Sequence, residues 1–583
     1  MLNKKTKIVC TIGPASESPE VLKELMLSGM NVCRLNFSHG SHEEHQARID
    51  TIKSVREEVK PAVAILLDTK GPEIRTGKFT DPEVNLEEGQ KFVITMDEVM
   101  GDNTRCTISY KGLINDVVPG NRILIDDGLI SLVVEKVEGN DIICEVENAG
   151  VVKNNKGVNV PGVIINLPAI TQKDKDDIIF GIKNGIDFIA ASFVRKASDV
   201  MAIREILEIN NGEHIQIISK IENQEGVDNI DEILKVSDGI MVARGDLGVE
   251  IPTEEIPIVQ KMIIRKCNFL AKPVITATQM LDSMIRNPRP TRAEVTDVAN
   301  AIYDGTDAIM LSGETAAGKY PVETLQTMAR IAVRIEDTLD YVSILRNRLS
   351  LRDWSITNAI SHASCTLAVD ISANAVITAT SSGYTARSVS SYRPQAPIIA
   401  AVSTPEVMRQ LSLVWGVVTV MGTPVNSTDE MFEQSVELSL KADFVKSGDT
   451  VVITAGVPVG EVGTTNLIKV HLVTDVVGRG VGIGNSSISG VARIISSVGD
   501  RFDDGDIFVG KFTDKDFMDK VQRASAIVVE ESGLTSHAAV VGVSLGIPVI
   551  VGAKNITENI SDGEMISLDL EKGFVYRGKI NLV

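Results

Sequence analysis

Eight apolar runs of strand length alternate with helical segments over residues 1–340, and this repeat limits the chain to few architectures. Each run is almost continuously hydrophobic, as expected for a parallel strand buried on both faces. The runs lie at 5–13, 31–38, 62–69, 188–193, 215–221, 239–244, 273–277 and 308–312. Eight such units predict a (β/α)8 TIM barrel. An open, doubly wound sheet is the alternative.

The repeat is interrupted once, after its third strand. Residues 70–166 have no helical period and show short alternating strands separated by Gly, Pro, Asn and Asp, which is typical of a small all-β unit. We therefore expect a catalytic barrel built from residues 1–69 and 167–340, with residues 70–166 inserted as a β-barrel lid domain.

A second α/β pattern begins after the barrel and predicts a separate domain at 341–474. Residues 475–487 are rich in glycine and are expected to form a linker that packs poorly. The remaining residues, 488–583, are enough for one further small α/β domain.

Composition excludes several classes of function. The chain of 583 residues has a formal charge of −20, which argues against binding nucleic acid or an anionic membrane surface. No apolar run is long enough to cross a membrane, and the start does not resemble a signal peptide. Six scattered cysteines without a Cys-x-x-Cys pair predict a reducing, cytoplasmic location with neither disulfides nor a zinc site.

Charged residues follow two neighbouring strands of the predicted barrel. Lys220 and Glu222 end one strand, and Asp246 ends the next. Catalytic groups of TIM barrels come from these carboxyl-terminal strand ends. Two carboxylates suit Mg²⁺ or Mn²⁺, and an ammonium group beside them suits chemistry on phosphate. Salt bridges at the rim are the structural alternative.

Other strand ends deliver polar groups to the same rim. Arg34 and Arg75 can hold and neutralise a phosphoryl group. An oxygen-rich set with a single charge suits a weakly bound monovalent cation, and it consists of Asn36, Ser38, Asp68 and Thr69. For any one residue a helix cap is an equally good explanation, but for the whole set it is a poor one. The sequence has no P-loop, so a nucleotide site must be built in another way.

Several runs together resemble the pyruvate kinase family from about residue 4 to 473. They are Thr11-Ile12-Gly13-Pro14, Arg34-Leu35-Asn36-Phe37-Ser38-His39-Gly40, Leu67-Asp68-Thr69-Lys70-Gly71-Pro72-Glu73-Ile74-Arg75, Lys220-Ile221-Glu222-Asn223-Gln224-Glu225-Gly226, Ala243-Arg244-Gly245-Asp246-Leu247-Gly248, Ala277-Thr278-Gln279-Met280-Leu281 and Met310-Leu311-Ser312-Gly313-Glu314-Thr315. The resemblance implies phosphoryl transfer from phosphoenolpyruvate to ADP, giving pyruvate and ATP in glycolysis.

The resemblance also implies roles for individual residues. Mg²⁺ would lie on Glu222 and Asp246, and Lys220 would stabilise the transferring phosphoryl group and the enolate. The backbone at Gly245 and the side chain of Thr278 would hold the substrate carboxylate.

Further implied roles concern the proton, the potassium ion and the nucleotide. Thr278, with Ser312 and Glu314 behind it, would deliver the proton. K⁺ would lie among the four oxygen-bearing residues named above, and the presence of Glu73 resembles the potassium-dependent members. The nucleotide would contact Arg75, His39 and Lys156, and the β insert would close as a lid that excludes water.

A hydroxyl-rich loop after a later strand is expected to bind the phosphate of an allosteric effector. Hydroxyls, backbone N–H groups and a helix start suit a phosphate, although an ordinary capped helix is the alternative. The loop comprises Thr380, Ser381, Ser382, Gly383, Tyr384 and Thr385. The later run 457–461 offers no cation, so we expect AMP or ribose 5-phosphate rather than fructose 1,6-bisphosphate. Family resemblance also implies a homotetramer.

The tail around Thr535-Ser536-His537-Ala538 resembles the swivelling phosphohistidine domain of phosphoenolpyruvate-utilising enzymes. Gly542-Val543 stands where those enzymes commonly carry Ala-Arg, and no ATP-grasp partner is recognisable. A structural role for the tail, with His537 not essential, is therefore expected. A phosphotransferase acting through His537 and a non-enzymatic sugar-phosphate sensor are the alternatives.

Overall fold

The computed structural model describes residues 4–59, 62–349, 355–425, 427–457, 465–484 and 487–580. The described residues form two compact units, of which the first comprises those within 1–362 and 380–424 together with residue 465, and the second the other described residues. No helix in the described part of the chain is both long and apolar enough to cross a membrane.

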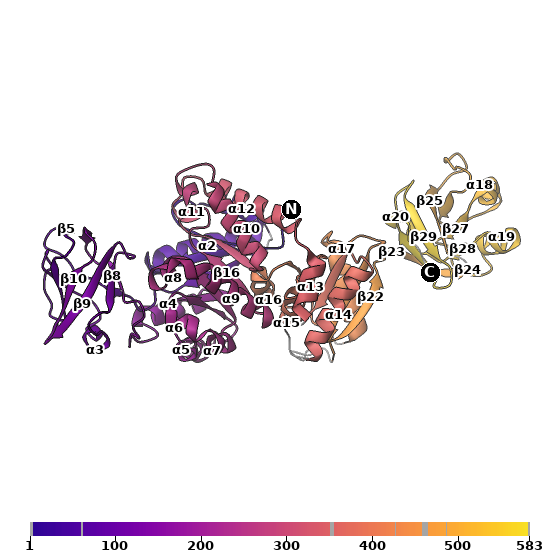
Figure 1. Ribbon diagram of the computed structural model, residues 1–583. Coiled ribbons are helices and arrows are strands. Elements are labelled where there is room, and N and C mark those ends of the chain that lie inside the picture. The colour runs from indigo at the N-terminus through magenta and orange to yellow at the C-terminus, as the bar shows by residue number, and fades with distance from the viewer. Residues whose placement is uncertain are drawn as a thin grey trace. The chain divides into compact units, whose positions relative to one another are not determined.

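The predicted (β/α)8 barrel is confirmed. Eight strands close in the order β1-β17-β16-β15-β14-β13-β3-β2, with parallel pairing throughout the registers. Figure 1 labels one of these strands, β16. The strands are β1 (Lys7–Thr11), β2 (Val32–Asn36), β3 (Ala64–Asp68), β13 (Phe188–Ala191), β14 (Gln216–Ile221), β15 (Gly239–Ala243), β16 (Val274–Ala277) and β17 (Ala308–Leu311). The alternative of an open sheet is therefore wrong.

Helices alternate with these strands, and several begin at recognisable caps. Ser18 caps α1 and Thr171 caps α4 by accepting backbone N–H groups, and Pro19 occupies the first turn of α1, where its missing N–H costs nothing. The barrel helices are α1 (Pro19–Leu27), α2 (His42–Val59), α4 (Gln172–Lys183), α5 (Ala197–Ile209), α6 (Gln224–Asp228), α7 (Ile230–Val236), α8 (Arg244–Glu250), α9 (Ile256–Phe269), α10 (Arg292–Asp304), α11 (Gly313–Ala316) and α12 (Pro321–Glu336).

Alternation along each strand divides the apolar side chains between two cores. On β1, Val9 belongs to the cluster inside the barrel, whereas Ile8 and Cys10 pack in the cluster that includes helix residues such as Leu22. All six cysteines are free and buried. The barrel is therefore filled by side chains, and polar groups gather only at its ends.

The insert between β3 and β13 is all β except for one short helix, and it has its own apolar core. A seven-stranded sheet and a two-stranded sheet form it. Its elements are β4 (Ile74–Arg75), β5 (Glu83–Leu86), β6 (Lys91–Thr95), β7 (Arg105–Thr107), α3 (Leu113–Asp116), β8 (Arg122–Ile125), β9 (Ile130–Glu138), β10 (Asp141–Val146), β11 (Gly150–Lys153) and β12 (Gly157–Asn159).

The predicted second α/β pattern follows the barrel. In the first unit β19 and β20 pair in parallel, and in the second unit β18 pairs in parallel with β21. The elements are α13 (Tyr341–Leu349), α14 (Ile356–Asp370), β18 (Ala375–Ala379), α15 (Tyr384–Ser390), β19 (Ile398–Val402), α16 (Pro405–Gln410), β20 (Val417–Met421), α17 (Thr428–Lys441), β21 (Thr450–Gly456) and β22 (Thr465–Leu472).

The C-terminal part of the second unit is a mixed eight-stranded sheet with short helices. Its strands are β23 (Val476–Arg479), β24 (Val481–Ile483), β25 (Ile488–Ile495), β26 (Ile507–Gly510), β27 (Ala526–Val529), β28 (Val549–Val551), β29 (Met565–Asp569) and β30 (Phe574–Arg577). Its helices are α18 (Met518–Arg523), α19 (His537–Leu545) and α20 (Ile556–Asn559).

The expected glycine-rich linker at 475–487 is wrong for most of its length. Strand β23 pairs with β30, and β24 pairs with β28. Glycine is needed here for close packing: a Cβ on Gly482 would lie 2.0 Å from the carbonyl oxygen of Leu570. The glycines therefore let strands approach other backbone, and the C-terminal sheet begins before residue 488. Residues 485–486 of the expected linker lie outside the described residues.

Candidate active site

A buried ionic cluster lies at the carboxyl-terminal ends of the barrel strands. The Lys220 Nζ atom lies 3.1 Å from Asp68 Oδ1 and 2.9 Å from Glu222 Oε1, and it donates to Ser192 Oγ at 2.8 Å. Arg34 Nε donates to the second oxygen of Asp68 at 2.6 Å. The structure thus brings together residues from β2, β3 and β14, as strand-end placement predicts.

Burial and pairing act in opposite directions on the charges of this cluster. Burial alone would lower the pKa of Lys220, but Asp68 and Glu222 outweigh it and raise that pKa. Burial would raise the pKa of Asp68, but Arg34 and Lys220 lower it. Lys220 is therefore a permanent cation and Asp68 a permanent anion at neutral pH.

Glu222 and Asp246 form the carboxylate pair expected to bind a divalent metal. Burial, and secondarily the charge of Asp246, raise the pKa of Glu222 to about 7, while Lys220 opposes the shift. Burial also raises the pKa of Asp246. The backbone N–H of Phe193 donates to Glu222 Oε2 at 2.6 Å. Two crowded carboxylates fit Mg²⁺, which binds through one or two carboxylates and takes its other ligands from water and substrate oxygens.

The described residues contain no cluster of three His, Cys, Asp or Glu side chains that could hold a metal by themselves. A divalent ion at Glu222 and Asp246 would therefore need further ligands of another kind, such as water or substrate oxygens. That dependence suits a site in which the metal and an anionic substrate bind together.

Of the oxygen-rich set expected for K⁺, Asn36 and Asp68 lie opposite each other in the pairing of β2 with β3. Asn36 Oδ1 accepts the backbone N–H of Ser38 at 3.1 Å. Thr69 Oγ1 accepts the backbone N–H of Ser192 at 3.1 Å. These oxygens are fixed by internal hydrogen bonds, and both oxygens of Asp68 already face cations.

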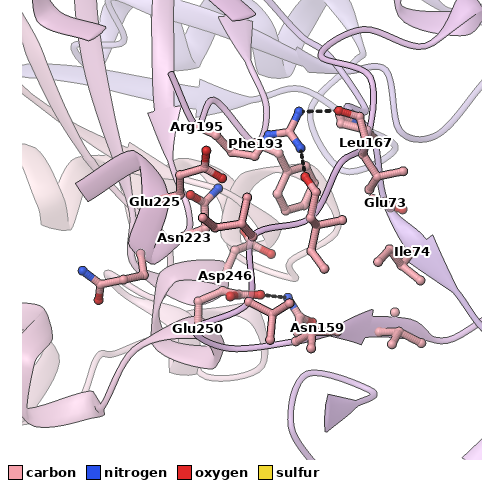
Figure 2. Close-up of a pocket in the computed structure, with 18 of the residues that line it drawn as sticks. Glu73, Ile74, Asn159, Leu167, Phe193, Arg195, Asn223, Glu225, Asp246 and Glu250 are labelled. Atoms are coloured by element: carbon pink, nitrogen blue, oxygen red, sulfur yellow. Dashed lines mark hydrogen bonds between the residues drawn. The ribbon is translucent and has the colours of Figure 1, made fainter. Parts of the chain in front are cut away.

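A cavity of about 560 Å³ lies between the lid and the barrel and reaches Asp246 (Figure 2). Arg75 and Lys156 both line it, because Arg75 on β4 pairs with Gly157 on β12, the residue that follows Lys156. Arg75 Nε donates to Glu73 at 2.6 Å, and Lys156 Nζ lies 2.9 Å from Asp126. His39 is exposed and does not line this cavity.

Thr278 follows β16 in the left-handed backbone region, with a φ of 69°. Its Oγ1 accepts the backbone N–H of Gly245 at 2.8 Å and donates to the carbonyl of Ala277 at 2.7 Å. The expected free N–H at Gly245 is therefore occupied by Thr278 in this structure. Arg244 fixes the turn by donating to the carbonyl of Thr278 at 2.9 Å while pairing with both oxygens of Asp297 at 2.7 Å.

Glu314, expected behind Thr278, is buried and acts on the backbone. Its carboxylate accepts the N–H groups of Leu281 at 3.1 Å and Ser312 at 2.7 Å, and burial raises its pKa. No hydrogen bond between Glu314 and Thr278 is recorded among the described residues.

Sequence reasoning missed the supporting role of the loop after β13. Ser192 hydrogen-bonds Lys220, and Phe193, with a left-handed φ of 56°, presents its N–H to Glu222. A polar Ser-Phe-Val-Arg-Lys end on a buried strand was the available signal, but residue types do not reveal contacts made by backbone N–H groups.

The hydroxyl-rich run 380–385 leads into α15 and includes its first two residues; the N-cap Gly383 has a φ of 76° and no side chain to cap the helix. Thr385 shares a hydrogen bond of 2.9 Å with Thr465. The helix therefore begins at a glycine cap, without a capping hydrogen bond from a side chain. Most of the cation-poor run 457–461 lies outside the described residues.

His537 is the first residue of α19, and its Nδ1 shares a hydrogen bond of 2.9 Å with the hydroxyl of Thr513. The residues of the active-site cluster belong to the first compact unit and His537 to the second.

Comparisons with known proteins agree with this geometry. Residues 3–325 match the pyruvate kinase barrel domain, 358–471 the pyruvate kinase alpha/beta domain, and 502–573 the mobile domain of PEP-utilising enzymes. Pyruvate kinases of Geobacillus stearothermophilus and Bacillus licheniformis are 57% and 56% identical, each over 100% of both chains.

A solved structure gives the same relationship. A pyruvate kinase from Cryptosporidium parvum is 42% identical, covers 81% of this chain and 96% of its own, and superposes with a TM-score of 0.78. The chain therefore belongs to the pyruvate kinase family, and it is a kinase of the form that carries a C-terminal PEP-utilising domain.

Proposed function

We propose that the chain transfers the phosphoryl group of phosphoenolpyruvate to ADP at the ionic cluster around Lys220. The observation that carries the proposal is the buried Lys220 ammonium group, held by Asp68 and Glu222 beside the carboxylate of Asp246. Phosphoryl transfer needs positioning and charge neutralisation more than covalent chemistry. A lysine that stays charged in a poorly hydrated site supplies that neutralisation.

The metal ions complete this proposal. Glu222 and Asp246 would hold Mg²⁺ or Mn²⁺, and Asn36, Ser38, Asp68 and Thr69 would hold K⁺. When bound, these ions neutralise charge on the substrate oxygens. Lys220 and Arg34 hold the phosphoryl oxygens, and Arg75 and Lys156, which line the cavity, contact the nucleotide together with His39.

Thr278 is proposed to deliver the proton that converts enolpyruvate to pyruvate. Its hydroxyl lies beside Gly245 at the end of β15, within the strand ends that surround Lys220. To deliver this proton, the hydroxyl must first break its hydrogen bond to the Ala277 carbonyl, so proton delivery and a local rearrangement at this turn are linked. The lid is proposed to close over the site and exclude water.

The decisive experiment is a coupled assay of pyruvate formation from phosphoenolpyruvate and ADP, with Mg²⁺ and K⁺ each present or omitted. Lys220→Met should lower kcat by about a hundredfold to a thousandfold, the range for losing one donor that stabilises transition-state charge. His537→Ala should leave kcat within about twofold, since we place His537 outside the chemistry. The reverse pattern would instead favour transfer through His537.

We further propose that the loop at 380–385 binds a phosphorylated effector and that the chain acts as a homotetramer. The left-handed Gly383 before α15 leaves the loop hydroxyls free of a capping role, which supports a phosphate site. AMP and ribose 5-phosphate should stimulate the enzyme. Tight stimulation by fructose 1,6-bisphosphate alone would contradict this choice, and sedimentation analysis of the native chain tests the assembly.

A further inference from the structure

The lid is joined to the barrel by two chain crossings, and both are held by barrel side chains. At the first crossing, the Gly71 N–H donates to Asp174 Oδ1 at 2.9 Å. Gly71 has a φ of 73°, and a Cβ there would lie 2.8 Å from Ser192 Cβ. The outgoing crossing is therefore tight against the loop that follows β13.

The return crossing, defined as residues 164–167, is gripped by Arg195. Arg195 Nη1 donates to the carbonyl of Ile165 at 2.7 Å, and Nη2 donates to the carbonyl of Leu167 at 2.8 Å (Figure 2). The planar guanidinium group thus contacts the carbonyls of two residues that are separated by one residue in the same segment. A lysine could not reproduce this two-point contact.

The lid side grips the residue between those two carbonyls. Asn166 donates from its backbone N–H and from Nδ2 to the carboxylate of Asp116, at 3.4 and 3.0 Å. Tyr110 donates to the same carboxylate at 2.7 Å. The return crossing is therefore bound to the barrel through the carbonyls of Ile165 and Leu167, and to the lid through Asn166.

Arg195 is itself held firmly. Its backbone N–H donates to Asp199 Oδ2 at 3.0 Å, its carbonyl accepts from Asn229 at 2.9 Å, and its side-chain Nε lies 3.5 Å from Asp199. The residue is 9% exposed. The barrel therefore fixes the backbone of Arg195, while the hydrogen bonds of its guanidinium group in the described residues go to the return crossing, and Nε makes none.

The same short loop also holds the catalytic cluster. Ser192 accepts from Lys220, and the Phe193 N–H donates to Glu222. Two residues further on, Arg195 holds the crossing. A shift of the return crossing therefore acts on a loop that positions both the proposed phosphoryl-binding lysine and a proposed metal carboxylate.

We propose that Arg195 is a positioning residue that sets the resting position of the lid hinge and links it to the Lys220 and Glu222 site. This inference rests on the proposed function, in which the lid carries Arg75 and Lys156 to the nucleotide. Arg195 does not touch substrate. It acts through the return crossing on one side and through Ser192 and Phe193 on the other.

Steady-state kinetics provide the first test. In Arg195→Gln, kcat/KM for ADP should fall about tenfold or more, the range for losing hydrogen bonds from a charged donor. The loss should lie mainly in KM for ADP, since Arg75 and Lys156 belong to the lid. Arg195→Lys, which can reach one carbonyl, should recover part of the loss.

Arg204→Gln is the matched control. Arg204 donates to the carbonyl of Val236 at 3.3 Å and to Asp238 at 2.8 Å, and among the described residues no hydrogen bond or ion pair joins it to the lid. Its variant should keep the native KM for ADP. An equal rise in both variants would show a general loss of packing and would overturn the hinge role.

A distance measurement separates this inference from the proposed function. All six native cysteines are buried, so spin labels can be placed selectively at Lys136→Cys in the lid and Lys183→Cys in the barrel. Without substrates, the distance distribution should broaden in Arg195→Gln and stay native in Arg204→Gln.

Two results would count against different claims. A distribution of native width in Arg195→Gln would overturn the hinge role of Arg195. A native distance that does not change when phosphoenolpyruvate, ADP, Mg²⁺ and K⁺ are added would instead count against lid closure, while a broadened Arg195→Gln distribution would still support the anchor.

Discussion

At the scale of single residues, the active site depends on Asp68 as the counter-ion of two cations. Asp68 is 1% exposed and faces Arg34 and Lys220 at 2.6 and 3.1 Å. In Asp68→Asn, two buried cations lose their shared anion, so the free energy of unfolding should fall by about 3–5 kcal/mol. Urea unfolding followed by circular dichroism measures this loss, and kcat should fall with it.

The exposed ion pair of Asp519 with Arg523 offers a control for Asp68→Asn. Asp519→Asn should unfold like the native chain because water screens an exposed pair. Equal stability of all three proteins would show that Asp68 has no special role as a counter-ion.

Strand-end reasoning predicted where Lys220, Glu222 and Asp246 lie, because a parallel barrel brings all carboxyl ends to one rim. It did not predict that Asp68 would neutralise Lys220. Residue types show that oxygen atoms gather at a rim, but only coordinates show which cation each oxygen faces. The same limit applies to Gly245, whose N–H was expected for substrate and is held by Thr278.

A pH-dependent contribution to stability is expected from Lys7 at the start of β1. Burial lowers its pKa to about 8, against the opposing charges of Glu336 and Asp307, and Nζ donates to the carbonyl of Val417. The unfolded chain keeps the ordinary value of 10.5 and binds more protons between these two values. Stability from this group should therefore rise with pH across this window, by about 3 kcal/mol in all.

Lys7→Met should remove that rise. The difference in unfolding free energy between Lys7→Met and the native chain, measured by urea denaturation at several pH values from about 8 to about 10, should change with pH. The surface variant Lys183→Met should show the native slope. A parallel response of native and Lys7→Met proteins would contradict the prediction.

At the scale of elements, the eight barrel strands and the all-β insert could be predicted, whereas strands β23 and β24 could not. Barrel strands can be recognised in the sequence as continuous apolar runs, because such strands are buried on both faces. In β23 and β24 glycines interrupt that signal, and in a sequence glycine equally indicates a flexible linker. These two strands pair with β30 and β28, which lie far along the chain. The composition of a short segment gives no information about such distant partners.

Gly482→Ala tests this reading of β24. The added Cβ would lie 2.0 Å from the Leu570 carbonyl oxygen, so the backbone must shift. We expect the free energy of unfolding of the C-terminal sheet to fall by about 1–3 kcal/mol. Hydrogen exchange of the C-terminal sheet measures it. Gly499→Ala, whose Cβ would meet no atom closer than 3.8 Å, is the control. Equal exchange in both variants would restore the linker interpretation.

At the scale of the whole molecule, the Cryptosporidium parvum relative matches only a part of this chain. That protein is matched over 96% of its own length by 81% of this chain, while the mobile-domain match occupies 502–573. A chain truncated after Val473 should therefore fold and keep kcat within about twofold of native. The coupled assay measures this, and loss of all activity in a folded truncated chain would show that the C-terminal domain takes part in catalysis.

The position of the insert has a consequence for how the chain folds. Strands β3 and β13 are barrel neighbours, yet the contact of Ile65 with Asp187 joins residues 122 positions apart. Closing so long a flexible loop costs conformational entropy before the contact is gained. Because the insert has its own core, its early collapse would bring its two ends together. A folded lid would then lower the entropy cost of pairing β3 with β13. A destabilised lid should therefore slow folding of the barrel.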